Sequence, residues 1–395
     1  MNPWQVNGPR SVRFGAGVRH EVGAYARPLA KRLIVLLGSR TLARQSLWTD
    51  WLEGLGQALP VVSDLTLPSR EPRVSDVDEL ARSLRGISAG PDDLVVVVGG
   101  GSAIDLVKAA CGMATQREVR SCREYLEGVG TGAKLVETPL RWIALPTTAG
   151  TGAEATRNAV ISSDASCIED EPPFKKSFRS DELYAAAVFL DPEWTVGLPR
   201  ETTIHSGLDA ITQLIESGIS GKRTPYTTML AGQGLAWGLP AFEQLLKDPH
   251  DIDARGQMLS AAYLSGVALA NSGLGIAHAV AAALGAELPI AHGRACAVML
   301  PHALDFNREV SGEALAHLAV AAGVARTAND TAVEALRARV VELVARCDIP
   351  SRLGALGVTR ERIPSLVRLS QGNSLTGNPR PVSPVQLHDW LEGLL

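Results

Sequence analysis

Four polar residues in the second half of the chain have the types and spacing of ligands for one divalent metal ion. Asp209 and Gln213 stand four apart in Gly207-Leu-Asp-Ala-Ile-Thr-Gln213, so on a helix both side chains project from one face. His278 and His292 follow in a stretch rich in Ala and Gly. Carboxylate oxygen and imidazole nitrogen suit Fe²⁺ or Zn²⁺, whereas a neutral amide oxygen binds either weakly. The sequence therefore predicts a metal site at Asp209, Gln213, His278 and His292, with Gln213 as its weakest ligand.

A glycine-rich turn marks a second candidate site, for a dinucleotide. An apolar run at residues 94–98 leads into three glycines and then into a helical stretch. Glycines let the backbone approach a pyrophosphate, and a helix start offers free amide hydrogens and a positive dipole end. Ser102 and Asp105 have the spacing of a capping box, which predicts that the helix starts near Ser102. The predicted cofactor contacts are Gly99, Gly100, Gly101, Ser102 and Asp105. A tight turn without a ligand is the alternative.

A second loop, at residues 145–156, supports the dinucleotide interpretation. It follows another apolar stretch and is made of small residues and hydroxyls, which suit a nicotinamide ribose and phosphates at the carboxyl ends of strands. Thr147, Thr148 and Thr151 are the predicted contacts. Each loop alone is a weak signal, and the two together favour a nucleotide-binding domain.

The elements that must position these residues divide the chain in two. The first half alternates β-branched runs with amphipathic stretches, which predicts strands at 33–37 and 94–98, a helix at 74–85 and a Rossmann-like parallel sheet. After about residue 192 Ala and Leu at helical spacing dominate. We expect an α/β dinucleotide-binding domain at 1–195 and an all-α domain at 196–395 that binds metal and substrate.

Composition narrows the class of protein. With 395 residues, 46% hydrophobic and 20% charged, the chain is long enough for two packed domains. A net charge of −4 with interspersed signs argues against nucleic acid and membrane as partners. The cysteines are odd in number and scattered, and residues 1–10 have no apolar signal core, so we expect a cytoplasmic protein. The five cysteines are Cys111, Cys122, Cys167, Cys296 and Cys347.

In combination and order, the motifs resemble the iron-containing (group III) alcohol dehydrogenase family, whose superfamily also holds glycerol dehydrogenase and dehydroquinate synthase. The resemblance runs from Phe14-Gly-Ala-Gly17 through the loops at 99–105 and 146–154 and Leu190-Asp-Pro192 to Gly377-Asn-Pro-Arg380. It implies a dehydroquinate synthase-like architecture and hydride transfer between NAD(P)H and a small alcohol, aldehyde or ketone. A homo-oligomer is common among similar enzymes.

Two positions depart from the family pattern. The family's metal ligands fall on Asp209, His278 and His292, but its second ligand, normally His, falls on Gln213, as in a branch of the superfamily that carries Gln there. A further His, credited with proton relay, falls on Ala282. Three outcomes stay open: a Lewis-acid metal with Gln213 as fourth ligand or water holder, a metal-independent reductase of the maleylacetate reductase type, and a dehydroquinate synthase-like lyase. We favour the metal, because two histidines in an apolar setting otherwise need separate partners.

The loss of the relay histidine directs attention to nearby polar groups. His205, Thr212 and His302 are candidates for proton transfer, and His205 joins Asp209, His278 and His292 as a predicted catalytic residue. In addition, Glu216 can orient a ligand from behind or remain solvated, and Cys296, four residues after His292, is predicted to be a small buried thiol rather than a stray ligand.

Cofactor choice has one readable clue. Family members selective for NAD carry Asp where this chain has Ser39, and Arg40 follows, so NADP(H) is the first prediction and acceptance of both cofactors the alternative. Lys175 aligns with a cofactor-contacting Lys of similar enzymes, although Lys176 beside it leaves the register open.

Overall fold

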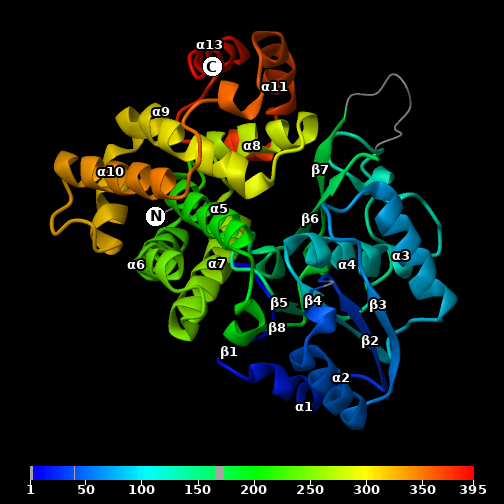
Figure 1. The fold of residues 1–395 in the computed structure, drawn as a ribbon. Helices are drawn as coiled ribbons and strands as arrows, with labels where there is room; N and C mark the ends of the chain where they lie inside the picture. Colours follow the sequence, from blue (N-terminus) through cyan, green and yellow to red (C-terminus); the bar gives the residue numbers. More distant parts are fainter. Residues whose placement is uncertain (1–2, 40, 165–172) are drawn as a thin grey trace. The chain divides into compact units, whose positions relative to one another are not determined.

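The protein is described by a computed structural model over residues 3–39, 41–164 and 173–395 (Figure 1). Arg40 and Cys167, which the sequence analysis singled out, lie outside these residues. The chain divides into two compact units. One consists of Gly8–Thr148 and Ala153–Val196, and the other of Gly197–Leu395 with Ala149–Gly152 and the N-terminal segment up to Asn7.

Specific contacts hold the two short segments in the second unit. The backbone N–H of Asn7 donates to Asn271 Oδ1 at 2.8 Å, and Asn271 Nδ2 donates back to the Asn7 carbonyl at 2.9 Å. Gly152 has a φ of +60° and lies so close to Gly266 that a Cβ would stand 2.4 Å from the Gly266 Cα. Both segments fall within residues 1–195, the predicted dinucleotide-binding domain.

The first unit is built on a parallel sheet, six-stranded in the described residues, with the order β1-β8-β5-β4-β2-β3. Every neighbouring pair is parallel, so the predicted Rossmann-like sheet is confirmed. The strands are β1 (Val12–Phe14), β2 (Arg32–Leu37), β3 (Val61–Thr66), β4 (Asp93–Gly99), β5 (Trp142–Pro146) and β8 (Ala187–Leu190), and β6 (Asn158–Ser162) pairs antiparallel with β7 (Lys175–Arg179) in a separate two-stranded sheet. The predicted strands at 33–37 and 94–98 are β2 and β4.

Helices bury the central strands. The unit contains α1 (Val22–Ala26), α2 (Ser46–Ala58), α3 (Val74–Gly86) and α4 (Gly101–Ala114), together with short 3₁₀ helices at Val18–Glu21, Leu42–Arg44, Cys122–Tyr125, Ala153–Ala155, Asp181–Leu183 and Pro192–Thr195. Alternate strand residues such as Leu33, Val35 and Leu37 form one core with Trp48 and Trp51 of α2. α4 packs against β4 and β5, with α3 beside it. The predicted helix at 74–85 is α3.

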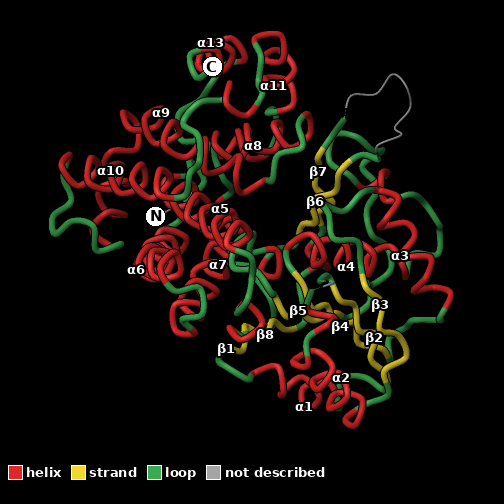
Figure 2. The backbone as a smooth tube through the Cα atoms, viewed as in Figure 1, coloured by secondary structure: helices red, strands yellow, loops and turns green. Residues whose placement is uncertain are grey.

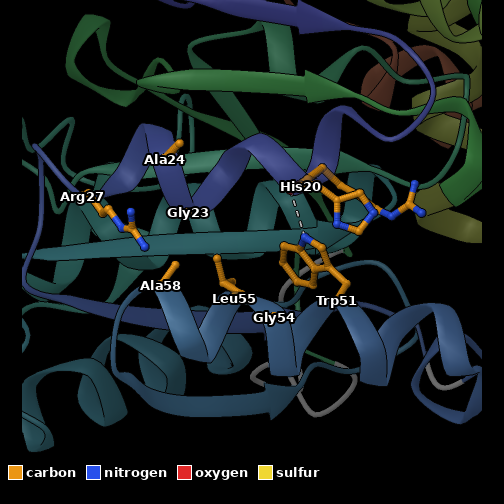
Figure 3. Close-up of a pocket in the computed structure, with 9 residues that line it drawn as sticks. His20, Gly23, Ala24, Arg27, Trp51, Gly54, Leu55 and Ala58 are labelled. Carbon is orange, nitrogen blue, oxygen red and sulfur yellow. Dashed lines mark hydrogen bonds between the residues drawn. The ribbon is translucent and has the colours of Figure 1, made fainter.

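A pocket of about 300 Å³ lies where α1 and the preceding 3₁₀ helix face α2 (Figure 3). The Trp51 indole N–H closes one end by donating to the Arg19 carbonyl at 2.9 Å. The pocket is lined by Arg19, His20, Gly23, Ala24, Arg27, Trp51, Gly54, Leu55 and Ala58. It contains none of the predicted site residues.

In the second unit, helices are the only regular secondary structure among the described residues, and loops connect them (Figure 2). The predicted all-α domain is confirmed. Its helices are α5 (Arg200–Ile219), α6 (Pro225–Lys247), α7 (Ile252–Ser272), α8 (Ile276–Glu287), α9 (His292–Ala321), α10 (Asp330–Arg346), α11 (Ile363–Leu369), α12 (Asn373–Gly377) and α13 (Pro384–Glu392), with 3₁₀ helices at Gly354–Leu356 and Arg360–Arg362. α5 is central, because it packs against α6, α7, α8 and α9. Within the described residues, no single helix combines the length and apolarity of a membrane span, although α7 and α8 pass that test as a pair bent by 101°.

Candidate functional site

Helix α5 carries three of the predicted site residues on one face. His205, Asp209 and Gln213 follow one another at intervals of four, which stacks their side chains along one side of the helix. Asp209 and Gln213 are 2% and 3% exposed, and His205, nearer the start of the helix, is partly buried. For Asp209 and Gln213, this is the shared helix face that the sequence predicted.

Glu216, one further turn along α5, fixes the start of α8 and with it His278. Its carboxylate accepts hydrogen bonds from the backbone N–H groups of Gly275, Ala277 and His278 at 3.1, 2.7 and 3.4 Å. It also lies 2.6 Å from His278 Nδ1. These amides are the groups that a helix start leaves without partners, so one buried carboxylate both caps α8 and sets the direction of His278 Nε2. These contacts fit the role of orienting a metal ligand from behind, which the sequence offered as one possibility for Glu216.

The first turn of α9 supplies His292 and, four residues later, Cys296. Between them Gly293 allows α9 to approach α5 closely, because a Cβ at Gly293 would stand 2.0 Å from the His205 carbonyl oxygen. Any larger residue must push these backbones apart. The close approach of α9 to α5 brings His292 to Asp209.

Four possible ligand atoms converge. Those of Asp209, His278, His292 and Cys296 all lie within 4.8 Å of one another. Asp209 Oδ1 is 3.2 Å from His278 Nε2 and 3.9 Å from His292 Nε2, and Cys296 Sγ is 3.6 Å from His292 Nε2. One carboxylate, two imidazoles and one thiol are a donor set for zinc or iron(II). The residues therefore fit a divalent metal ion.

The charges in this cluster are strongly coupled. Burial acts to raise the pKa of Asp209, but the hydrogen bond from His278 and the charges of both histidines hold it below its ordinary value. For His278, burial acts to lower the pKa, and Cys296, Asp209 and Glu216 raise it well above the ordinary value. Burial raises the pKa of the Cys296 thiol to about 12. A cation here replaces protons as the counter-charge to the carboxylates.

Gln213 lies beside this cluster with both ends of its amide engaged. The Ser265 hydroxyl donates to Gln213 Oε1 at 2.6 Å, and Gln213 Nε2 donates to the Thr151 carbonyl at 3.3 Å. Ser265 had no part in the sequence analysis. The amide thus ties α5 to α7 and to the segment 149–152, and its role as a ligand stays a prediction.

The three proton-transfer candidates lie in different settings. Burial lowers the pKa of His205 below its ordinary value of 6.5, with Glu201 opposing the shift, so the imidazole is neutral at physiological pH. The Thr212 hydroxyl donates to the Leu208 carbonyl of its own helix at 2.7 Å. His302 contacts the Ser351 carbonyl at 2.8 Å and lies ten residues along α9 from His292, or about 15 Å. The Thr212 hydroxyl is thus engaged within its own helix and His302 is remote from His292, which leaves His205, one turn before Asp209, as the candidate for proton transfer.

In the first unit, the glycine turn lies where the strand order reverses. β2 pairs with β3 on one side and β4 on the other, and ligands of open parallel sheets bind at such a switch point, beyond the carboxyl ends of the strands. A Cβ at Gly38 would stand 2.3 Å from Ala103 Cβ, and one at Gly99 would stand 2.7 Å from the same atom. Glycines at the ends of β2 and β4 therefore let α4 begin at the sheet edge. Gly38 was not among the predicted cofactor contacts, which included only the glycines of the triplet.

The predicted capping box at the start of α4 is wrong. The helix begins at Gly101 with Gly100 as its N-cap, and no side chain caps it. Asp105 instead accepts from the Val160 N–H at 2.9 Å and pairs with buried Lys108 at 3.2 Å. A charged buried lysine needs this partner, and its demand overrides the local capping preference. The first amides of α4 consequently have no side-chain acceptor, which suits a phosphate.

The second loop and the two other cofactor candidates are placed as follows. Thr148 lies against the glycine turn, since a Cβ at Gly100 would stand 3.1 Å from its Oγ1, and the Thr147 N–H donates to the Gly99 carbonyl at 3.0 Å. Ser39 follows β2, where its hydroxyl accepts from the Leu42 N–H at 3.2 Å. Lys175 on β7 forms an ion pair with Glu71 at 2.6 Å. Thr151 belongs to the helical unit.

The comparisons with known proteins follow the same division. The sequence profile for iron-containing alcohol dehydrogenase matches residues 9–192, and that for the C-terminal part of the Fe-containing alcohol dehydrogenase family matches residues 203–394. The chain is 32% identical over 321 residues to the probable alcohol dehydrogenase EutG of Escherichia coli, covering 81% of this chain and 76% of that protein. This chain belongs to the iron-containing alcohol dehydrogenase family. It is also 30% identical to the 1-propanol dehydrogenase PduQ of Salmonella typhimurium, with 87% and 89% covered.

Solved structures agree with this family. A 1,3-propanediol oxidoreductase superposes over all of both chains with a TM-score of 0.87 at 25% identity. A maleylacetate reductase from Agrobacterium tumefaciens, the type considered as a metal-independent alternative, is a more distant neighbour at a TM-score of 0.77, with 26% identity over 100% of this chain and 99% of that one. Family members use NAD(H) or NADP(H) and a metal, and act on small alcohols and aldehydes.

Proposed function

We propose that this protein is a metal-dependent, NAD(P)(H)-linked alcohol dehydrogenase or carbonyl reductase acting on a small substrate. One observation carries the proposal: Asp209, His278 and His292 come from three different helices, yet their ligand atoms converge in a largely buried place. A carboxylate and two imidazoles whose ligand atoms meet in this way are a donor set for zinc or iron(II). The family relationship supports the same chemistry.

Within this proposal each residue has a stated role. Asp209, His278 and His292 hold the ion, and Glu216 positions His278 through its Nδ1. A divalent metal held there supplies Lewis-acid charge to a substrate oxygen during hydride transfer. Gln213 ties the segment 149–152 to α5, and it either contributes to the ion or orders a water beside it.

The same proposal places the dinucleotide at the glycine turn. Gly99, Gly100 and Gly101 bring the backbone close to the pyrophosphate, and the uncapped amides of α4 hold it. The nicotinamide gives or takes the hydride. Thr147, Thr148, Thr151 and Lys175 are the further proposed contacts. We propose NADP(H) as the preferred cofactor, since Ser39 places no carboxylate where it would repel a 2′-phosphate.

His205 is the proposed proton-transfer group in the absence of a histidine at position 282. Its imidazole is neutral at physiological pH, so it can accept the alcohol proton during oxidation and, once protonated, return it during reduction. Its place one turn before Asp209 supports this role.

The proposed setting of the enzyme rests on general features. The free, buried thiols of Cys111, Cys122, Cys296 and Cys347 suit a reducing compartment, and we propose the cytoplasm. Homo-oligomerisation is proposed from the family relationship. A short-chain aldehyde, ketone or alcohol is the proposed substrate, because relatives include a 1-propanol dehydrogenase.

The test combines metal analysis with kinetics. Protein purified without added metal or chelator is analysed for iron and zinc, and NADPH and NADH oxidation is followed on a panel of small aldehydes before and after chelation. We expect near-stoichiometric metal, activity lost on chelation and activity restored by metal. Full activity in metal-free protein would overturn the metal-dependent mechanism and point to the metal-independent reductases.

A further inference from the structure

The fourth donor atom of the buried cluster is a sulfur. Cys296 follows His292 by one helical turn, is fully buried, and has its Sγ 3.6 Å from His292 Nε2. Residues four apart project from the same face of a helix, so Cys296 and His292 approach Asp209 together. The thiol is thus a member of the cluster rather than an isolated cysteine in the core.

Gln213, the other candidate for a fourth ligand, is occupied elsewhere. Its Oε1 accepts from Ser265 at 2.6 Å and its Nε2 donates to the Thr151 carbonyl at 3.3 Å. The amide oxygen keeps a second lone pair, but the contacts with Ser265 and Thr151 already fix its direction. The Cys296 sulfur lies within 4.8 Å of each of the other three ligand atoms.

The distances between the ligand atoms fit one ion. For tetrahedral zinc, metal–ligand bonds of about 2.3 Å to sulfur and about 2.1 Å to nitrogen and oxygen place sulfur about 3.6 Å from nitrogen, and nitrogen about 3.4 Å from oxygen. The observed Sγ–Nε2 distance is 3.6 Å, and the two Oδ1–Nε2 distances are 3.2 and 3.9 Å. The other pairs among the four ligand atoms also lie within 4.8 Å.

Charge favours the same set. Among the groups bound directly to the ion, the Asp209 carboxylate and a Cys296 thiolate match its two positive charges, while the Glu216 carboxylate stands behind His278, 2.6 Å from its Nδ1. When the ion enters, the Cys296 thiol releases one proton to solvent and its sulfur donates an electron pair to the metal.

We propose that Cys296 is the fourth protein ligand of the metal, with Asp209, His278 and His292, and takes the place of the family histidine that is Gln213 here. The substrate oxygen would then bind as a fifth ligand, an expansion that catalytic zinc allows. This inference rests on the proposed metal site. Because a thiolate is a soft ligand, the set Asp-His-His-Cys selects zinc over iron(II). We therefore expect the apoprotein to bind Zn²⁺ more tightly than Fe²⁺, which a competition titration measures.

Cobalt(II) reports on the ligands directly. The apoprotein, prepared by chelation, is titrated with Co²⁺ alone, and its absorption spectrum is recorded for wild type, Cys296→Ser, Gln213→Ala and Cys347→Ser. Cys347 is also a free, buried thiol and serves as the matched control. We expect a thiolate-to-cobalt charge-transfer band in the near ultraviolet at one Co²⁺ per chain. Cys296→Ser should abolish this band, and the other two variants should retain it.

Zinc affinity gives a second measurement. Competition with a chromophoric chelator should show a loss of about tenfold or more for Cys296→Ser, and a much smaller loss for Gln213→Ala. Circular dichroism of the apoproteins checks folding, and the wild-type spectrum is informative even if Cys296→Ser fails to fold.

The possible failures are distinguishable. Stoichiometric Co²⁺ binding without the charge-transfer band in wild type, or a band that survives in Cys296→Ser, would overturn the role of Cys296 and leave the proposed function intact. Failure of the wild-type protein to bind either Co²⁺ or Zn²⁺ would overturn both.

Discussion

Glu216→Gln tests how the site is positioned, because this substitution keeps the shape of the side chain and removes its charge. In the wild type, Oε2 accepts from Gly275 and from His278 N and lies 2.6 Å from His278 Nδ1, while Oε1 accepts from Ala277 at 2.7 Å. A glutamine has only one oxygen. Even if that oxygen replaces Oε2, its NH₂ group faces the Ala277 N–H, so a donor opposes a donor.

The magnitude follows from these contacts. Losing one charge-assisted hydrogen bond costs roughly 1.5–3 kcal/mol, and the unsatisfied Ala277 N–H adds about 1 kcal/mol or more. We therefore expect the free energy of unfolding to fall by about 3 kcal/mol. His278 also loses the carboxylate that fixes its tautomer, so the affinity for zinc should fall about 10- to 100-fold.

Urea denaturation of the apoprotein measures the first effect, and zinc competition measures the second. Glu309→Gln is the control, because Glu309 is an 81% exposed glutamate that pairs with Arg380 at 3.7 Å, and such surface pairs contribute at most about 1 kcal/mol. The reasoning is refuted if Glu216→Gln matches this control in stability and its zinc affinity changes by less than about threefold.

Four further predictions address other parts of the protein. In Gly293→Ala, the added Cβ would meet the His205 carbonyl at 2.0 Å, so α9 must shift. Denaturation should show that the free energy of unfolding falls by about 2 kcal/mol or more, and titration should show a lower affinity for zinc; unchanged values for both would contradict the close approach. In the wild type, we expect the rate of alcohol oxidation to fall off only below pH 6.5, because burial lowers the pKa of His205. In His205→Gln, alcohol oxidation should slow about tenfold or more and this acid limb of the pH–rate profile should vanish; retention of that limb would exclude His205 as the base. Burial raises the pKa of Glu154 from 4.5 to about 7. The protonated carboxyl group therefore contributes its full stability below pH 4.5, and about 3 kcal/mol of that stability is lost as the pH rises through 7. Because the glutamine of Glu154→Gln cannot ionise, denaturation from about pH 5 to about pH 8 should show the stability difference between wild type and variant shifting in the variant's favour. Finally, Ser39→Asp should lower the ratio of kcat/KM for NADP(H) to kcat/KM for NAD(H) by at least about tenfold, because the carboxylate repels the 2′-phosphate. An Asp can still accept the hydrogen bond from the Leu42 N–H; an unchanged ratio would show that this position does not contact the adenosine ribose.

Much of the fold could be predicted because it depends on short-range periodicity. The β-branched runs that became β2 and β4 have no stable alternative to buried parallel strands once helices cover both faces, and the Ala- and Leu-rich second half can bury its apolar faces only as packed helices. The shared face of Asp209 and Gln213 likewise needed only the geometry of one helix. The glycine triplet was recognisable because its function is a backbone property that shows directly in the residue type.

Tertiary structure decided which groups from different elements meet. The capping box at Ser102 and Asp105 failed because buried Lys108, which no local pattern marks as buried, requires the Asp105 carboxylate. Glu216 meets His278 across 62 residues of sequence, and that contact depends on where α8 begins relative to α5.

Cys296 shows most clearly what the sequence alone could not determine. Its spacing from His292 was visible in the sequence, and so was its apolar surrounding, which favoured a core thiol. Whether its sulfur faces the core or the ligands depends on how α9 crosses α5, and that crossing is fixed by the close approach at Gly293. Local sequence determines the face of a helix on which a side chain lies, but only the packing of helices against one another determines what that face meets.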